Sequence, residues 1–321
     1  MTTAASVPAV LRADHLDAAD VEGVLALASV AGDTDGAYPL SEHVVLHVRQ
    51  GGDAPAVHLM VRDPDGTLVG YAHVDTTDEV EGAAAELVVH PLRRRRGLGR
   101  ALVAAAVAAA PDGRLRLWAH GDHPSAGALA LGLGFERARV LFQMRRSLFA
   151  PLPDLRLPDG VSIRAFRPGA DDEEWVRVNA RAFAHHPDQG KWTVHDLRIR
   201  MSEPWFDPGG FLIAVADPTG EMLGFHWTKV HGSAAEHQHD PIGEVYVLGV
   251  DPSAQGRGLG GALTVAGLRH LRSQGIDQAM LYVDESNTAA VALYTRLGFA
   301  RWSTDVSYRR LPGAPPGSWS R

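Results

Sequence analysis

A glycine-rich segment in the second half of the chain has the residue types and spacing to bind a phosphate group. Gln255-Gly-Arg-Gly-Leu-Gly260 lies between an apolar stretch that ends at Val250 and a helix-forming stretch from Ala262 to Ser273. Closely spaced glycines let backbone N–H groups converge on one point, and the following helix adds the positive end of its dipole. We expect this loop to bind a pyrophosphate, and the alternative interpretation is a tight turn.

Two better-known phosphate motifs do not fit this segment. No Lys-Ser/Thr pair follows the last glycine, so the loop is not a P-loop. The glycine spacing also differs from that of a dinucleotide-binding fold. The loop therefore belongs to another class of phosphate site.

The chain contains this segment twice. Residues Glu86 to Leu102 match Val247 to Leu263, 161 residues later. A second match pairs the run that ends at Phe135 with the run that ends at Phe299, 164 residues later. Repeats of this length predict duplicated domains rather than a solenoid of small units.

Each half shows the same order of elements. A helical stretch is followed by two alternating apolar runs, a strand before the glycine segment, an Ala- and Leu-rich helix, a further strand, a helix that ends in Gly-Phe, and a closing strand. This order predicts an α/β protein with a mixed sheet in each half. We expect an N-terminal domain over residues 1–149, a proline-rich linker over 150–160, a C-terminal domain over 161–312 and a flexible tail over 313–321.

The composition excludes several classes of protein. The formal net charge of −7 gives no electrostatic footprint for nucleic acid or an anionic membrane, and no apolar run approaches the length of a transmembrane helix. The chain has no cysteine, which rules out disulfides and a cysteine nucleophile. Its 16 histidines are mostly scattered, so we expect no metal site. We expect a cytoplasmic monomer that binds small molecules, with no secretory signal.

Two motifs resemble those of one superfamily. Val250-Asp-Pro-Ser-Ala-Gln-Gly-Arg-Gly-Leu-Gly-Gly-Ala-Leu263 resembles the acetyl-CoA loop of GNAT-type N-acetyltransferases. Asn287-Thr-Ala-Ala-Val-Ala-Leu-Tyr-Thr-Arg-Leu-Gly-Phe299 resembles the second CoA motif of that superfamily. The resemblance covers each half almost completely. It implies two tandem GNAT domains, each a mostly antiparallel sheet flanked by helices, an acetyl-CoA co-substrate and no metal.

A closer resemblance, over nearly the whole chain, is to tandem enzymes of this superfamily that acetylate desacetylmycothiol, a cysteine joined to a glucosamine–inositol unit. The stretches that carry it begin at Ala85, Trp118, Ala182, Trp205, Gly224, Gly243 and Leu281. The resemblance implies acetyl transfer to the cysteinyl amine. Two alternatives are an N-acetyltransferase for another amine, such as a peptide N-terminus or an aminosugar, and a non-catalytic acetyl-CoA-binding sensor.

Acetylation of an amine requires a proton acceptor for the amine and a proton for the leaving thiolate. The resemblance implies that Glu244 is the general base and Tyr294 the general acid. Taken alone, the first is typical of a solvated strand-end charge and the second of a core aromatic. The repeat pairs them with Ala83 and Ala130, so we expect chemistry in the second half only. No covalent acetyl-enzyme is needed, because the amine attacks directly.

The resemblance also implies binding residues. Those for the amine substrate are Glu42, Asp188, Lys229, Glu244 and Tyr282, and Asp188 stands where the family has Glu. Those for CoA share a strand end, a glycine loop or a helix start: Leu87, Val88, Val89, Arg95, Arg96, Gly97, Leu98, Gly99, Arg100, Leu248, Gly249, Val250, Gln255, Gly256, Arg257, Gly258, Leu259, Gly260, Gly261, Asn287, Thr288, Ala289, Ala290, Val291 and Ala292. Arg93 to Arg96 add positive charge to the first loop.

Overall fold

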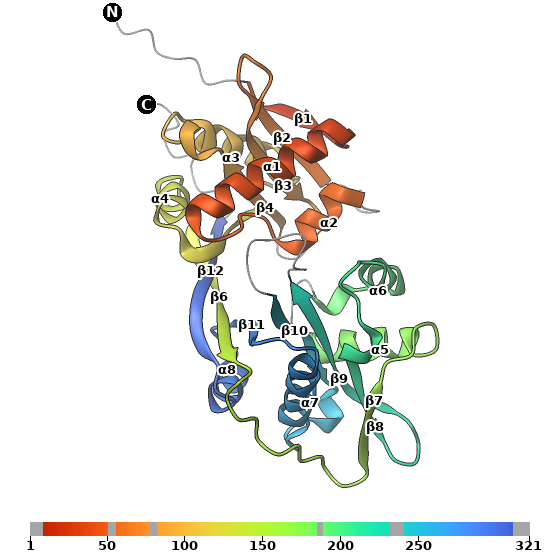
Figure 1. Cartoon of the computed structure of the whole chain (residues 1–321). Coiled ribbons are helices and arrows are strands. Elements are labelled where there is room, and N and C mark those ends of the chain that lie inside the picture. The colour runs from red at the N-terminus through yellow and green to blue at the C-terminus, as the bar shows by residue number, and fades with distance from the viewer. Residues whose placement is uncertain (1–8, 51–55, 78–81, 185–188, 232–240, 311–321) are drawn as a thin grey trace, which may run out of the picture. The chain divides into compact units, whose positions relative to one another are not determined.

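The structure is a computed structural model of the chain that describes residues 9–50, 56–77, 82–184, 189–231 and 241–310 (Figure 1). It divides into two compact units. The first comprises Met1–Leu141 and Ser303–Arg321, and the second comprises Phe142–Trp302. None of the described helices is long and apolar enough to cross a membrane.

The first unit is a six-stranded sheet with helices on both faces. Its strand order is β1-β2-β3-β4-β5-β12, in which only β4 and β5 are parallel neighbours. The strands are β1 (Leu11–Ala13), β2 (Ala56–Arg62), β3 (Leu68–Asp75), β4 (Ala83–Val89), β5 (Leu115–Ala119) and β12 (Ala300–Arg310). The helices are α1 (Ala18–Asp35), α2 (Glu42–Gln50), α3 (Leu98–Ala109) and α4 (Pro124–Gly132).

Residues that alternate along each strand of the first unit pack on opposite faces of the sheet. Leu59 and Val61 of β2 pack with α3 in one cluster, while Met60 packs with α1 and α2 in another. The start of α1 is capped by Asp17, whose side chain accepts a hydrogen bond from the Asp20 N–H at 2.8 Å. Burial on both faces explains why these strands read as nearly continuous apolar runs.

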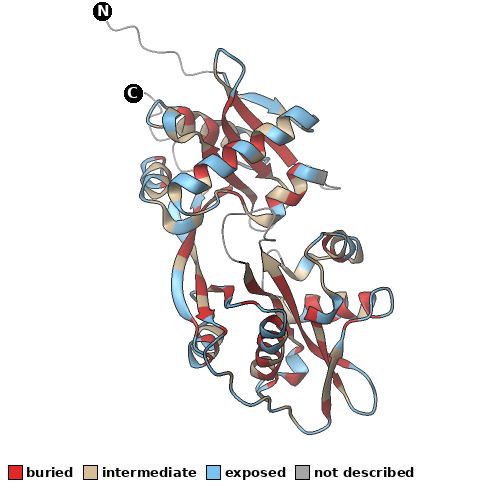
Figure 2. Ribbon diagram, in the orientation of Figure 1, coloured by how far each residue is buried: buried red, intermediate tan, exposed pale blue. Residues whose placement is uncertain are grey.

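The second unit repeats this architecture. Its strand order is β6-β11-β10-β9-β8-β7, and β10 and β11 are parallel. The strands are β6 (Glu136–Ser147), β7 (Val161–Ala165), β8 (Phe211–Ala216), β9 (Met222–His231), β10 (Ile242–Val250) and β11 (Gln278–Asp284). The helices are α5 (Asp172–Ala182), α6 (Val194–Met201), α7 (Leu259–Ser273) and α8 (Thr288–Arg296). The buried residues again gather on the inner strands and on the helix faces toward them (Figure 2). The predicted α/β class with a mixed, mostly antiparallel sheet in each half is confirmed.

The closing strand of the chain differs from the predicted domain boundaries. The repeat predicts that each domain contains its own last strand, so that residues 161–312 form one domain. Instead, β12 pairs with β5 of the first unit, from Val306 opposite Ala119 to Arg310 opposite Leu115. The second part of β6 lies in the second unit, where Met144 is buried in the core that also holds Leu281. The chain therefore enters the second unit within β6 and returns to the first within β12. The tail predicted over 313–321 lies outside the described residues.

Candidate functional site

The glycine loop of the second unit presents an open helix start. It connects β10 to α7, and Gly256 and Gly258 adopt left-handed φ angles of 77° and 82°. Gly258 is the N-cap of α7, and no described side chain caps the first turn of this helix. A Cβ added to either glycine would meet no atom within 4 Å. The first turn of α7 is thus uncapped by the described side chains and has open space beside its N-cap glycine, as an anion site requires.

The first unit has the same loop with one substitution. Gly97, the N-cap of α3, has a φ of 84°, and it likewise receives no side-chain cap among the described residues. Arg95 stands where the second loop has Gly256 and adopts a left-handed φ of 62°. This conformation costs a non-glycine residue roughly 1–2 kcal/mol. The first loop keeps the shape of a phosphate site at the cost of local strain.

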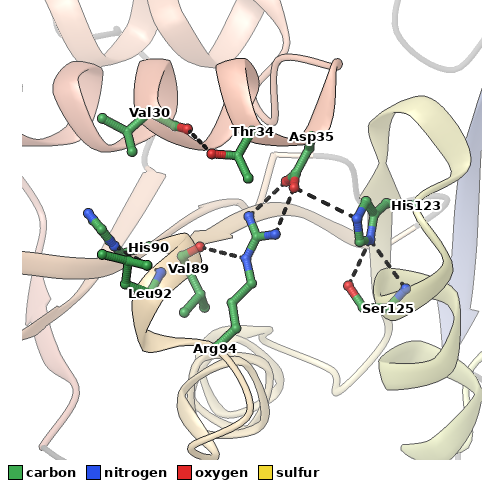
Figure 3. Close-up of polar contacts among 9 residues, drawn as sticks. All are labelled: Val30, Thr34, Asp35, Val89, His90, Leu92, Arg94, His123 and Ser125. Carbon is green, nitrogen blue, oxygen red and sulfur yellow. Dashed lines mark hydrogen bonds and ion pairs between the residues drawn. The ribbon is translucent and has the colours of Figure 1, made fainter.

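Arg94 links the first loop to β4 and to α1 by hydrogen bonds (Figure 3). Its Nε donates to the Val89 carbonyl at 3.1 Å, and its two terminal nitrogens donate to the two carboxylate oxygens of Asp35 at 2.7 Å each. Asp35 ends α1, and one of its oxygens lies 3.7 Å from Nε2 of His123, the N-cap of α4. The hydrogen bond from Arg94 is the main reason that the pKa of Asp35 is lowered.

The arginine run of the first loop is therefore only partly available for a phosphate. Arg93 donates to Asp63 at 2.6 Å, in addition to the pair made by Arg94. In the second unit, Gln255 stands in place of Arg94, and its described hydrogen bond is the one to the strand, from Nε2 to the Val250 carbonyl at 3.1 Å. The prediction that all four arginines add charge to the phosphate site is wrong for Arg93 and Arg94, which neutralise internal carboxylates.

Glu244 lies buried in the middle of the second sheet. It sits on β10 opposite Lys229 of β9 and Met280 of β11, just before a bulge between Val245 and Val247. Its Oε2 atom lies 2.6 Å from Nε2 of His231, the last residue of β9. The carboxylate is thus a buried group with a named partner rather than a solvated strand-end charge.

Tyr294 lies on α8 and is also buried. Its ring packs edge-on against Phe299, with centroids 5.8 Å apart. Burial raises the pKa of Tyr294 to about 12, so the phenol holds its proton at neutral pH and can donate a hydrogen bond. Asn287 precedes the same helix, and its side-chain oxygen accepts from the Ala290 N–H at 3.1 Å.

The predicted substrate-binding residues have different surroundings. The Nζ of Lys229 lies 4.6 Å from the ring centre of Trp205 and 5.4 Å from that of Tyr246. Tyr282 lies on β11, is 44% exposed, and its hydroxyl accepts from Nε2 of Gln143 at 2.7 Å. Lys229, Tyr282 and Glu244 therefore lie on three successive strands of the second sheet.

Two further predicted substrate residues do not belong to the described part of the second unit. Glu42 is the first residue of α2 in the first unit and is half-buried. Asp188 lies outside the described residues. Sequence reasoning missed His231 and Trp205, although both fall in stretches that carry the resemblance. The available signal was the spacing of His231 and Lys229, because residues two apart share one face of a strand.

The first unit has no carboxylate at the position equivalent to Glu244. The register of β3 with β4 puts Ala84 at the position of Glu244, one residue from the predicted Ala83 because β10 carries a bulge. Nearby, the ring of His120 lies between Glu86, at 3.4 Å, and Asp305 of β12, at 3.0 Å. Burial alone would lower the pKa of His120, but its hydrogen bonds to both carboxylates raise it to about 10.

Three further histidines of the first unit cluster in its interior. The ring centres of His47, His58 and His73 lie 4.9 to 5.7 Å apart, so residues that are scattered along the sequence come together in the fold. Burial lowers the pKa of His58 to about 4 and that of His73 to about 3. The paired positions in the second unit hold the stacked rings of Phe211 and Trp227. Within the described residues, no cluster has the arrangement of a metal site.

A cavity of about 370 Å³ lies beside the second glycine loop. Its walls include Arg156 and Leu157 of the linker and Arg257, Gly258 and Gly261 of the loop and α7. The linker thus forms part of the surface next to the candidate phosphate site.

Comparisons with known proteins agree with this geometry. A model of the Acetyltransferase (GNAT) family matches residues 31–135 and 175–299. The chain is 62% identical over 303 residues to the mycothiol acetyltransferase of Salinispora arenicola, covering 94% of this chain and 96% of that protein. It is 59% identical to the mycothiol acetyltransferase of Acidothermus cellulolyticus, covering 89% of this chain and 90% of that protein.

Solved structures share the fold. A GCN5-related N-acetyltransferase from Sphaerobacter thermophilus superposes with a TM-score of 0.66 at 26% identity, covering 94% of this chain and 95% of that chain. A tandem GNAT protein from the clavulanic acid biosynthesis pathway superposes with a TM-score of 0.71 at 22% identity, covering 95% and 98%. At the latter identity, the likeness concerns the fold alone.

Proposed function

The chain belongs to the mycothiol acetyltransferases of the GNAT family, which use acetyl-CoA, and from this premise we propose that its second unit acetylates the cysteinyl amine of desacetylmycothiol. The observation that carries the proposal is the buried carboxylate of Glu244. It lies on β10, the strand that leads directly into the open glycine loop. The strand therefore carries a proton acceptor and leads into the candidate phosphate site.

The reaction follows from the two buried groups. As the neutral amine attacks the thioester carbonyl, Glu244 accepts the amine proton, and the C–S bond breaks while the amide bond forms. Tyr294 donates its proton to the departing thiolate, and the phenolate and the protonated Glu244 then return to their starting states by proton exchange with solvent. The products are the amide and CoA. The N–H groups after Gly258 would hold the pyrophosphate of acetyl-CoA.

Substrate recognition is assigned to polar groups on the neighbouring strands. Lys229 presents an ammonium held over two aromatic rings, and Tyr282 presents a hydroxyl on an exposed strand position. A glucosamine–inositol unit offers many hydroxyls to such donors and acceptors. Glu42 and Asp188 remain substrate-binding proposals that rest on the family resemblance.

The first unit is proposed to bind acetyl-CoA or to act as a scaffold without catalysis. Its loop keeps the left-handed glycine and the open helix start. Alanine stands at both catalytic positions, at Ala84 on β4 and at Ala130 on α4. The residue ranges 1–149 and 161–312 still describe the two sequence repeats, and the closing strands cross between the compact units.

A panel of amines tests the proposal. CoA release is measured with cysteinyl-glucosaminyl-inositol, free cysteine, glucosamine and a dipeptide as acceptors, in the wild-type chain and in Glu244→Gln. We expect the first acceptor to have the highest kcat/KM, and we expect the variant to lose about 10²–10⁴-fold in kcat with little change in binding. Preference for another amine would support the alternative acetyltransferase. Acetyl-CoA binding without turnover on any acceptor would support the sensor.

A further inference from the structure

His231 contacts the proposed base, and the acid–base scheme above assigns it no role. Its Nε2 lies 2.6 Å from Oε2 of Glu244. The Glu244 side chain is only 9% exposed, whereas that of His231 is 36% exposed. The pair therefore joins a buried carboxylate to a partly exposed ring at the C-terminal end of β9.

Resting on the proposed function, we infer that His231 is a positioning residue that holds Glu244 in its reactive orientation. A carboxylate on a strand can rotate about its side-chain bonds, and a general base must aim one oxygen at the amine. An N–H donor on Oε2 fixes that oxygen and leaves Oε1 for the substrate. A hydrogen bond to an ionised carboxylate also offsets part of the cost of burying it.

The ammonium group of the neighbouring Lys229 lies over aromatic rings. Lys229 stands directly across the strands from Glu244, yet its ammonium lies over the rings of Trp205 and Tyr246. The described contact at hydrogen-bond distance from the Glu244 carboxylate is the one from His231. The geometry therefore gives the histidine, rather than the lysine, the task of orienting the base.

The pair is confined to the proposed catalytic unit. The register of β3 with β4 places Ala84 at the position equivalent to Glu244, so the carboxylate of the pair is not repeated there. A merely structural link between the two strands would be equally useful in both units. Its presence in one unit follows the proposed chemistry.

Three variants separate orientation from general stability. His231→Leu removes the donor, His231→Gln keeps an N–H donor of similar reach, and His231→Leu combined with Glu244→Gln tests whether the histidine acts through the base. The matched control is His270→Leu. His270 makes the same type of contact in the same unit, from Nε2 to Oδ2 of Asp207 at 2.7 Å, but on α7.

We expect His231→Leu to lose about 10–100-fold in kcat, the usual value of a charge-assisted hydrogen bond, with an unchanged KM for acetyl-CoA. His231→Gln should retain most of the wild-type kcat. In the Glu244→Gln background, the loss of His231 should add less than about threefold, because the group it orients is already inactive. His270→Leu should keep the wild-type kcat.

Several results would overturn the inference. One is a kcat for His231→Leu within twofold of wild type, and another is an undiminished loss in the Glu244→Gln background. An equal loss in His270→Leu would also overturn it, because the effect would then be one of stability. Failure of the proposed function is seen separately: if Glu244→Gln itself keeps the wild-type kcat, the base is wrong before any histidine variant is considered. All chains are compared by thermal unfolding to verify that they fold.

Discussion

Placing a carboxylate in the second glycine loop should abolish turnover at ordinary acetyl-CoA concentrations. Gly258 is the N-cap of α7, and a Cβ built on it meets no protein atom within 4 Å, so Gly258→Asp creates no clash within the protein. The new charge would lie beside the bound pyrophosphate. At about 4 Å and an effective dielectric constant of about 20, the repulsion is about 4 kcal/mol. That corresponds to about a thousandfold rise in the KM for acetyl-CoA.

Two controls separate charge from backbone strain and one unit from the other. Gly258→Asn imposes the same left-handed φ of 82° on a side chain of the same shape without the charge, and should cost far less in KM. Gly97→Asp makes the charged change in the first loop, where φ is 84°. It should weaken acetyl-CoA binding to the first unit while turnover stays within a few-fold of wild type.

The assay is steady-state CoA release over a wide range of acetyl-CoA concentrations, with calorimetric titration of acetyl-CoA to count the sites of each variant. Equal losses of activity in Gly258→Asp and Gly97→Asp, with both chains folded, would refute the division into one catalytic and one non-catalytic unit. An equal loss in Gly258→Asn would show that strain, rather than charge beside a phosphate, causes the effect.

Three further outcomes are expected. Tyr294→Phe should lower kcat about tenfold, which is a smaller loss than that of Glu244→Gln, because a thiolate with a conjugate-acid pKa near 8.5 can leave without a proton donor. A larger loss in Tyr294→Phe than in Glu244→Gln would contradict the roles given to the two residues. Lys229→Met, which keeps the apolar stem, should raise the KM for the amine about tenfold and leave the KM for acetyl-CoA unchanged. Equal changes in the two KM values would show that the lysine does not belong to the acceptor site. The pKa of His120 is raised to about 10 in the folded chain, so its contribution to stability is complete below pH 6.5 and is lost as the pH rises towards 10. Urea unfolding of the first unit should show this decline, His120→Gln should show a flatter profile, and identical profiles would contradict the assignment.

The sequence predicted the loops better than it predicted the contacts between distant segments. The left-handed φ of Gly97 and Gly258 is a local demand that only glycine meets easily, so the spacing of glycines located both loops. The contact between His231 and Glu244 depends on strand register and on a bulge, and the spacing of residues along the chain predicts neither of them. The partner of Arg94 was missed for the same reason, because Asp35 lies 59 residues away.

The domain boundaries also depend on contacts between distant segments, which the sequence did not predict. A repeat identifies the type of each element, but the neighbour of a strand is decided by packing over the whole fold. Nothing in the residues from Ser303 to Arg310 distinguishes a strand that closes its own sheet from one that closes another.

The return of β12 to the first unit has a consequence for the history of the gene. A duplicated copy is ordinarily free to be lost. Here, deleting the first repeat would also remove β6, the strand next to β11, and ending the chain after the second repeat's last helix would remove β12, the neighbour of β5. Once the closing strands had crossed, each repeat became a structural part of the other, and the loss of either one would leave a sheet without a strand.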